Sequence, residues 1–226
     1  MATKTAAKKN ANGNTSQETT IQVPAKVTMQ AKKKDLVIEL PALDLKQVEI
    51  ILIGDTPLIC NQWSEKAKQA MRDAQGKKPQ QKKEAKDSEA IFRASLYEVD
   101  GGYGFPAVGI KKAAIDACSY VGAVTKVAAR GTFHIHGEYV VVQGKPHKRE
   151  DMVRVGMDKA DLRYRGCFNE WRITFTVTYN AAVLSVEQIA NLFNLAGFSV
   201  GIGDYRPQRN GPFGRFHVAT AAEMKG

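Results

Sequence analysis

Near the C-terminus, glycine, arginine and aromatic residues are interleaved in a pattern that suits contact with a chain of phosphates. Between positions 200 and 215 the sequence contains Gly201, Gly203, Gly211, Gly214, Arg206, Arg209, Arg215, Tyr205 and Phe213. Glycine lets a backbone approach a ligand closely, and exposed backbone N–H groups in such a loop bind anions. The guanidinium of arginine pairs with phosphate and stacks on bases. The pattern predicts a nucleic-acid-binding loop in which Tyr205 and Phe213 stack on bases. A long helix-to-strand turn with solvated arginines is the alternative.

Two further groups of basic residues extend the predicted interface. Arg163 and Arg165 flank a tyrosine in a stretch that alternates charged and apolar residues, which suits backbone binding combined with stacking. Ion pairing with nearby acids is the alternative for these two arginines. Lys111 and Lys112 lie at the start of a predicted helix. The sequence leaves open whether the lysine-rich segment 76–86 also contacts the ligand.

Residues able to carry catalysis or to bind a metal are few and scattered. His134 and His136 alternate along a predicted strand and therefore share one face. No third histidine, cysteine or carboxylate stands at a spacing typical of a metal site. General acid–base catalysis needs a positioned proton donor or acceptor, and Asp204 is a further isolated candidate. We predict a protein without catalytic residues, metal or cofactor.

The charge and cysteine content indicate the class of partner and the compartment. The chain has a net charge of +10 at pH 7 and a pI near 9.5, a balance that favours a polyanionic partner. Its apolar runs are too short for a transmembrane helix, and residues 1–20 lack the hydrophobic segment of a secretory signal. Cys60, Cys118 and Cys167 are widely spaced and odd in number, as expected of reduced thiols. These features predict a cytoplasmic protein without a membrane partner.

Composition divides the chain into a tail and one domain. Residues 1–34 carry seven lysines against one glutamate and almost no large apolar residues. Such a segment cannot bury enough surface to offset the entropy lost on ordering. We therefore predict a disordered basic tail at 1–34 and a single nucleic-acid-binding domain at 35–226. Non-specific attraction of the tail to phosphates is possible on charge alone.

Hydrophobic periodicity predicts an α+β fold. The predicted elements are strands at 48–53, 132–136, 138–142, 151–155 and 171–179 and helices at 108–120 and 186–196. The last helix has Ser185 as its N-cap and Gln188 at the capping-box position. Asp100-Gly101-Gly102 is a strong turn signal. We expect an antiparallel sheet flanked by helices, with inserted loops and β-hairpins.

Three short stretches in this order resemble the RAMP superfamily, whose members form backbone and processing subunits of CRISPR effector complexes. They are Thr56-Pro57-Leu58-Ile59 after the first strand, Phe105-Pro106-Ala107 followed by Lys111-Lys112-Ala113-Ala114, and the loop from Gly201 to Gly214 followed by Phe216-His217-Val218. The resemblance spans residues 47–219. It implies a ferredoxin-like, RRM-type core that binds single-stranded RNA through backbone contacts, with several copies side by side.

The sequence departs from the catalytic members of this superfamily. The acidic loop of the target-cleaving members cannot be placed on any residue, and no His–Lys or paired-histidine cluster matches the processing members. The separation between Gly203 and Gly211 is also unusual. A phage-type protein that uses the same core on single-stranded DNA is therefore an alternative to a CRISPR subunit.

The function predicted from the sequence is binding of single-stranded nucleic acid with weak sequence specificity, without catalysis, by a homo-oligomer assembled along the strand. One alternative is a RAMP-type endoribonuclease. Another is a phage structural or assembly protein whose basic tail neutralises packaged nucleic acid. The choice between DNA and RNA depends on contacts to the 2′-hydroxyl, which the sequence leaves open.

The predicted tail leads to a truncation experiment. A chain that begins at Asp35 should remain soluble and should melt as cooperatively as the full chain, because residues 1–34 have little apolar surface to pack. Thermal melts followed by circular dichroism measure this. Loss of the cooperative transition on truncation would assign a structural role to the tail.

Overall fold

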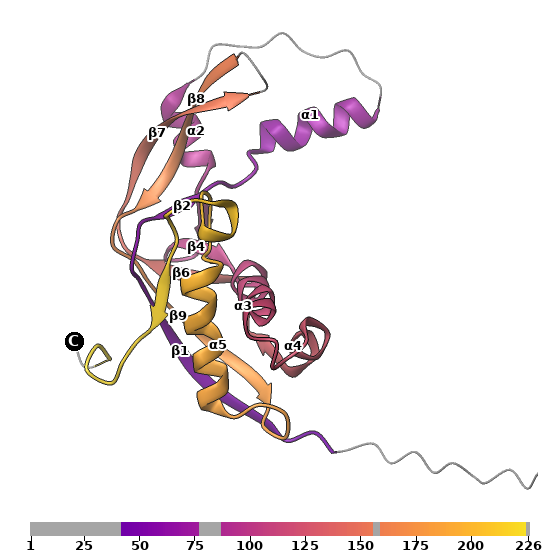
Figure 1. Cartoon of the computed structure of the whole chain (residues 1–226). Helices are drawn as coiled ribbons and strands as arrows, with labels where there is room; N and C mark the ends of the chain where they lie inside the picture. Colours follow the sequence, from indigo (N-terminus) through magenta and orange to yellow (C-terminus); the bar gives the residue numbers. More distant parts are fainter. Residues whose placement is uncertain (1–41, 77–86, 156–158, 225–226) are drawn as a thin grey trace, which may run out of the picture. The chain divides into compact units, whose positions relative to one another are not determined.

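The computed structural model describes residues 42–76, 87–155 and 159–224, which belong to one unit spanning Pro41–Gly226. The predicted tail 1–34 and positions 77–86 of the lysine-rich segment lie outside the described residues. In chain order the elements (Figure 1) are β1 (Leu45–Gly54), β2 (Leu58–Cys60), α1 (Glu65–Gln75), α2 (Ser88–Ala94), β3 (Tyr97–Val99), β4 (Gly102–Pro106), α3 (Ala107–Val121), α4 (Lys126–Thr132), β5 (Phe133–Ile135), β6 (Tyr139–Gln143), β7 (Pro146–Val155), β8 (Lys159–Phe168), β9 (Arg172–Asn180), α5 (Val186–Ser199), the 3₁₀ turn η1 (Pro207–Arg209) and β10 (Phe216–Val218).

The larger sheet has the strand order β10-β1-β9-β6-β4-β3, and β5 also pairs with β9. β1 lies between β9 and β10 and is antiparallel to both, while β6 is antiparallel to β9. The chain thus passes through β1, α3, β6, β9, α5 and β10 in a βαββαβ order. This is the ferredoxin-like arrangement, so the predicted α+β class, with an antiparallel sheet flanked by helices, is confirmed.

The core lies between this sheet and the helices α3 and α5, which pack against each other (Figure 1). Alternate residues of β9 are buried, beginning with Ile173 and Phe175, while the threonines between them are half-buried. Phe193 of α5 meets Phe175 edge to face, with ring centroids 5.5 Å apart. Such aromatic pairs stabilise a core beyond the area that they bury. The alternation predicted for 171–179 is therefore confirmed as a strand with one face in the core.

The helix α5 begins as predicted and ends later. The Ser185 hydroxyl accepts a hydrogen bond from the Gln188 backbone N–H at 3.3 Å, and the Ser185 N–H donates to the Gln188 side chain at 2.9 Å. This reciprocal pair is the predicted capping box. The helix then runs through Gly197, where a helix end was predicted, to Ser199. A Cβ on Gly197 would lie 1.8 Å from the Phe216 carbonyl oxygen, so this glycine serves close packing of α5 on β10 and does not stop the helix.

Two other segments correct the predictions. Residues 126–132 form the helix α4, where no helix was predicted and a strand was expected to begin at Thr132. The Thr125 hydroxyl accepts from the Ala128 N–H at 3.1 Å and caps this helix. This helix contains valine, glycine and threonine, which have lower helix propensity than alanine or leucine. The sequence pattern therefore did not predict it. The stretch after Gly144, where only a short strand at 151–155 was predicted, forms two ten-residue strands, β7 and β8.

The hairpin β7–β8 belongs to a second sheet with the order β2-β8-β7. β2 pairs with the end of β8 through Leu58 opposite Phe168 and Ile59 opposite Cys167. The Ser95 hydroxyl, at the end of α2, accepts a hydrogen bond from the Gly166 N–H at 2.7 Å. The base of the hairpin is thus fixed by β2 and by the end of α2.

Neither a membrane-spanning helix nor a disulfide is present among the described residues. No helix there combines the length and apolar character needed to cross a membrane. Cys60, Cys118 and Cys167 are buried free thiols. Burial, with a smaller contribution from Cys167, raises the pKa of Cys60 to about 12. The Cys60 thiol therefore stays protonated and unreactive at neutral pH.

His217 connects β10 to two acidic side chains at the edge of the sheet. Its Nδ1 lies 2.6 Å from Asp55 Oδ1 and its Nε2 lies 3.2 Å from Glu223 Oε1. Burial alone would lower the pKa of His217, but the hydrogen bonds to Asp55 and Glu223 outweigh it and raise the pKa above its usual 6.5. Because the folded pKa is the higher one, the stabilisation is complete below the unfolded value and is lost as the pH rises through the folded value.

Replacing His217 by glutamine should therefore destabilise the protein most in mildly acidic solution and progressively less as the pH rises above 6.5. Urea melts of the parent and H217Q across this range measure the difference. His147, an exposed histidine of β7, provides the control H147Q. A parent-to-H217Q difference that stays constant with pH would contradict the assignment of the charged pair.

Candidate nucleic-acid interface

Residues 200–215, called the glycine loop below, connect α5 to β10 and are held by the segment that follows β1. The Gly214 N–H donates to the Pro57 carbonyl at 2.8 Å, and the Asp204 N–H donates to the Ile59 carbonyl at 2.9 Å. The Arg215 N–H donates to the Thr56 hydroxyl at 2.9 Å. Two of the stretches that carry the RAMP resemblance are thus adjacent in space.

The four predicted glycines serve the packing of the loop on itself and on β2. Gly201, Gly203 and Gly214 have positive φ, at 67°, 78° and 67°, where other residues are strained. A Cβ on Gly211 would lie 1.7 Å from the Tyr205 carbonyl oxygen, and a Cβ on Gly203 would lie 2.5 Å from the Ile59 carbonyl oxygen. The glycines therefore fix the shape of the loop. Close approach of a ligand to the loop backbone stays a prediction.

Three backbone N–H groups of the glycine loop have no acceptor within the described part of the chain: those of Gly203, Tyr205 and Arg206. Tyr205, like Gly203, has positive φ, at 51°. Left-handed residues within a turn build concave arrangements of N–H groups that bind anions. These three donors are a feature that the glycine spacing alone could not locate.

The three predicted arginines of the loop have different surroundings. Arg206 donates to the Gly203 carbonyl at 3.0 Å and to the Gln208 side chain at 3.1 and 3.3 Å. Arg209 is exposed, and its side chain makes no hydrogen bond or ion pair with the described residues. Arg215 lies over the Phe198 ring at 5.3 Å. Arg209 is therefore the arginine most available to a ligand.

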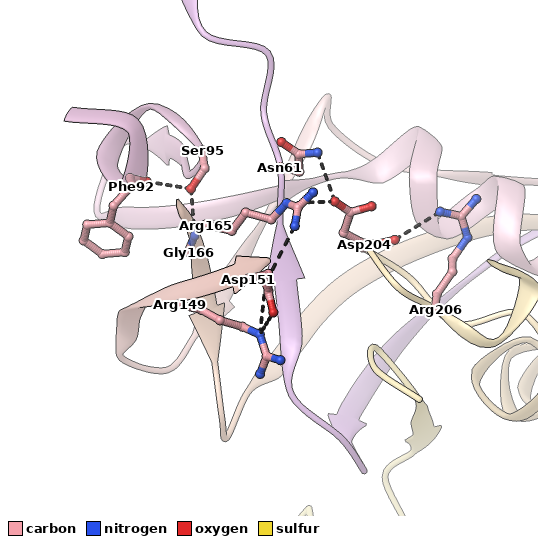
Figure 2. A network of polar contacts seen from close by, with 10 residues as sticks. Asn61, Phe92, Ser95, Arg149, Asp151, Arg165, Gly166, Asp204 and Arg206 are labelled. Carbon is pink, nitrogen blue, oxygen red and sulfur yellow. Dashed lines mark hydrogen bonds and ion pairs between the residues drawn. The ribbon is translucent and has the colours of Figure 1, made fainter. Parts of the chain in front are cut away.

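Arg165, predicted to bind nucleic acid, is buried beneath the glycine loop (Figure 2). Its Nε lies 3.0 Å from Asp204 Oδ2 and its Nη1 lies 3.6 Å from Asp151 Oδ2. Neither nitrogen makes a hydrogen bond of good geometry, although both are fully buried. Its neighbour Arg163, on the same strand, is exposed. The structure thus gives Arg165 the position of a residue that holds the loop, and leaves Arg163 open to solvent.

Both predicted stacking surfaces already contact an arginine of the hairpin. Arg165 Cζ lies 5.2 Å from the centre of the Tyr205 ring, and Arg149 Cζ lies 4.6 Å from the centre of the Phe213 ring. Arg149 is itself oriented by Asp151, whose carboxylate oxygens lie 2.9 and 3.2 Å from its Nε. One face of each ring is therefore covered by the hairpin, and the hairpin and loop form one rigid contact.

The two predicted lysines of α3 point to different neighbours. Lys112 donates to Asp116 at 2.9 Å, and Asp116 also accepts from Lys126 at 3.2 Å and from Gln208 at 3.0 Å. Burial would raise the pKa of Asp116, but hydrogen bonds from Lys112, Gln208 and Lys126 outweigh it and lower that pKa to about 2. The Asp116 carboxylate therefore joins the glycine loop to α3. A single aspartate within a helix gives no sequence signal for this role.

Lys111 turns toward α4 and β5. Its Nζ donates to the Arg130 carbonyl at 3.0 Å and lies 3.2 Å from His134 Nδ1. Burial lowers the pKa of Lys111. His136 instead contacts the Thr178 hydroxyl at 2.6 Å. The lysine–histidine pair joins positions 23 residues apart, which is why the sequence did not reveal it.

Comparison with known proteins gives little beyond this geometry. No family model matches the chain, and no curated protein matches it. A solved structure similar to it is that of Cmr6 from Pyrococcus furiosus, at 9% sequence identity and a TM-score of 0.37, covering 79% of this chain and 100% of the other. We draw no conclusion about function from a similarity at this TM-score. The ferredoxin-like assignment rests on the strand order, and the RAMP resemblance stays a prediction.

The contrast between Arg165 and Arg163 gives a matched pair of variants. Arg165→Met should lower the free energy of unfolding by about 3 kcal/mol, because it leaves two carboxylates without the buried cation that they face. Arg163→Met on the same strand should change it by less than about 0.5 kcal/mol. Urea denaturation of the two variants measures both values. Equal effects would contradict a special structural role for Arg165.

Proposed function

We propose that this chain binds single-stranded nucleic acid without catalysis, and that the glycine loop contacts the phosphate backbone. The observation that carries the proposal is the meeting of two kinds of anion-binding group in one loop. Backbone N–H groups of Gly203, Tyr205 and Arg206 have no acceptor among the described residues, and Arg209 of the same loop is exposed. Amide nests and guanidinium groups both favour phosphate.

The rigidity of the loop supports this proposal. The carboxylates of Asp116 and Asp204 fasten it to α3 and to the hairpin, so little conformational entropy is lost when a ligand binds. Phosphate contacts position a strand without reading its bases, which agrees with weak sequence specificity. The net charge of +10 adds long-range attraction to a polyanion. The proposal includes assembly of several copies along one strand, which the resemblance to RAMP proteins implies.

Endoribonuclease activity is a second candidate, favoured by the pairing of Lys111 with His134. The distance of 3.2 Å between Lys111 Nζ and His134 Nδ1 places two groups that can exchange protons side by side. Incubation of labelled RNA with the parent and with His134→Ala separates the candidates. Cleavage by the parent that is lost in the variant would support the enzyme and contradict non-catalytic binding.

The phosphate contacts can be tested by replacing Arg206, Arg209 and Arg215 together by alanine. Binding to a labelled oligonucleotide should weaken, and the slope of log affinity against log salt should fall by about 2, since each contact on a single strand contributes about 0.7. Fluorescence anisotropy across a salt titration measures both. The melting temperature should fall only slightly, because these side chains lie outside the core.

A control variant removes the same charge elsewhere. Lys46, Arg72 and Arg93 are exposed on β1, α1 and α2, and their joint replacement by alanine should leave most of the salt slope intact. If the loop variant binds as tightly as the parent at every salt concentration, the glycine loop is a structural turn and the proposed function fails.

A further inference from the structure

We propose that the cavity between α3 and the glycine loop receives one nucleobase of the bound strand and prefers a base with an exocyclic amino group. This inference rests on the proposed function and adds a base preference to it. The cavity has a volume of about 250 Å³ and is lined by Asn61, which directly follows β2, and by residues of β3, β4, α3 and the glycine loop. It is smaller than the roughly 300–1,000 Å³ typical of sites for drug-sized ligands, which suits a single base.

The walls of the cavity suit a flat aromatic ligand. Tyr97 and Phe105 line one part, with their ring centroids 6.1 Å apart. Gly109 and Ala113 of α3 line another part without large side chains. Bases stack on aromatic side chains with little dependence on their identity. Stacking therefore favours entry of any base, and the polar residues of the cavity favour bases with an exocyclic amino group.

Asn61 and Asp204 both line the cavity, and their side chains lie next to each other (Figure 2). The Asn61 Nδ2 donates to Asp204 Oδ2 at 3.0 Å. Because a carboxylate only accepts, this contact fixes the amide orientation and turns Asn61 Oδ1 away from Asp204. Arg165 Nε lies 3.0 Å from the same Oδ2. Within the described residues no donor reaches Asn61 Oδ1 or Asp204 Oδ1.

The oxygen atoms Asn61 Oδ1 and Asp204 Oδ1 favour a ligand that can donate hydrogen bonds to them. Cytosine and adenine carry an amino group where thymine and uracil carry a carbonyl oxygen. The cytosine amino group has two protons and can donate to both Asp204 and Asn61, whereas uracil offers a single N–H, at N3, between two carbonyl oxygens that would face an acceptor without a proton. Arg206 of the loop and Lys112 of α3 line the same cavity, so the sugar-linked phosphate of the bound nucleotide would lie near two cations.

The test compares oligodeoxynucleotides of dC and dU of equal length, which differ in this amino group and the matching ring proton. At neutral pH the parent should bind the dC strand about tenfold more tightly, the size of one additional hydrogen bond, the one accepted by Asn61. Asn61→Ala should bring the ratio close to one. Asn169→Ala, at an exposed asparagine between β8 and β9, is the control and should keep the parent ratio.

Each outcome bears on a different claim. Salt-dependent binding of both strands with equal affinity would overturn the base pocket and leave the proposed function standing. Failure of every strand to bind at low salt would overturn the proposed function itself. The ratio of the parent's affinities for the dC and dU strands tests the base pocket even if a variant does not fold. Free cytidine monophosphate should compete weakly; competition as effective as that of the dC strand would assign the pocket to a free nucleotide instead.

Discussion

The contact of the Arg165 guanidinium with two carboxylates is the interaction on which the candidate site depends. Arg165 belongs to the inserted hairpin, whereas Asp204 belongs to the glycine loop, and their atoms lie 3.0 Å apart. The cation is buried, so losing a carboxylate partner would leave a buried charge that is less well compensated. Its hydrogen bonds are poorly aligned, so its attraction to the carboxylates is largely ionic. This contact sets the position of the loop relative to the hairpin.

The glycine loop achieves its shape by excluding side chains from its own interior. Gly211 and Gly214 lie so close to backbone carbonyls that a Cβ would be 1.7 to 1.8 Å from an oxygen atom. The N–H groups of Gly203, Tyr205 and Arg206 in the same loop have no acceptor among the described residues. Close backbone packing and N–H groups without acceptors therefore occur in one loop. A loop built this way offers donors that are already oriented before a ligand arrives.

Local signals in the sequence predicted some elements, such as β9 and α5, but not α4 or the full length of β7 and β8, and they did not predict contacts between distant segments. The alternation of β9 and the capping box of Ser185 depend on neighbours within a few residues, so the strand and the start of α5 could be predicted. The burial of Arg165 depends on Asp204, and the roles of Asp116 and Gly197 depend on Gln208 and Phe216. A charged residue in an alternating strand has the same local pattern whether it faces solvent or a buried carboxylate. The sequence therefore could not predict which of these residues support the loop and which are exposed, and binding of nucleic acid by the exposed ones stays a prediction.

The pairing of β2 with β8 carries a consequence for the order of folding. Leu58 lies opposite Phe168, and the Asp204 N–H then donates to the Ile59 carbonyl of the same short strand. Contacts between residues so far apart in sequence form late, since loop-closure entropy must be overcome first. The cavity is likewise lined by distant segments, with Asn61 after β2, Gly109 in α3 and Asp204 in the glycine loop. A chain in which β2 and the glycine loop have not yet met therefore lacks the complete cavity, and under the proposed function it would also lack the complete binding site.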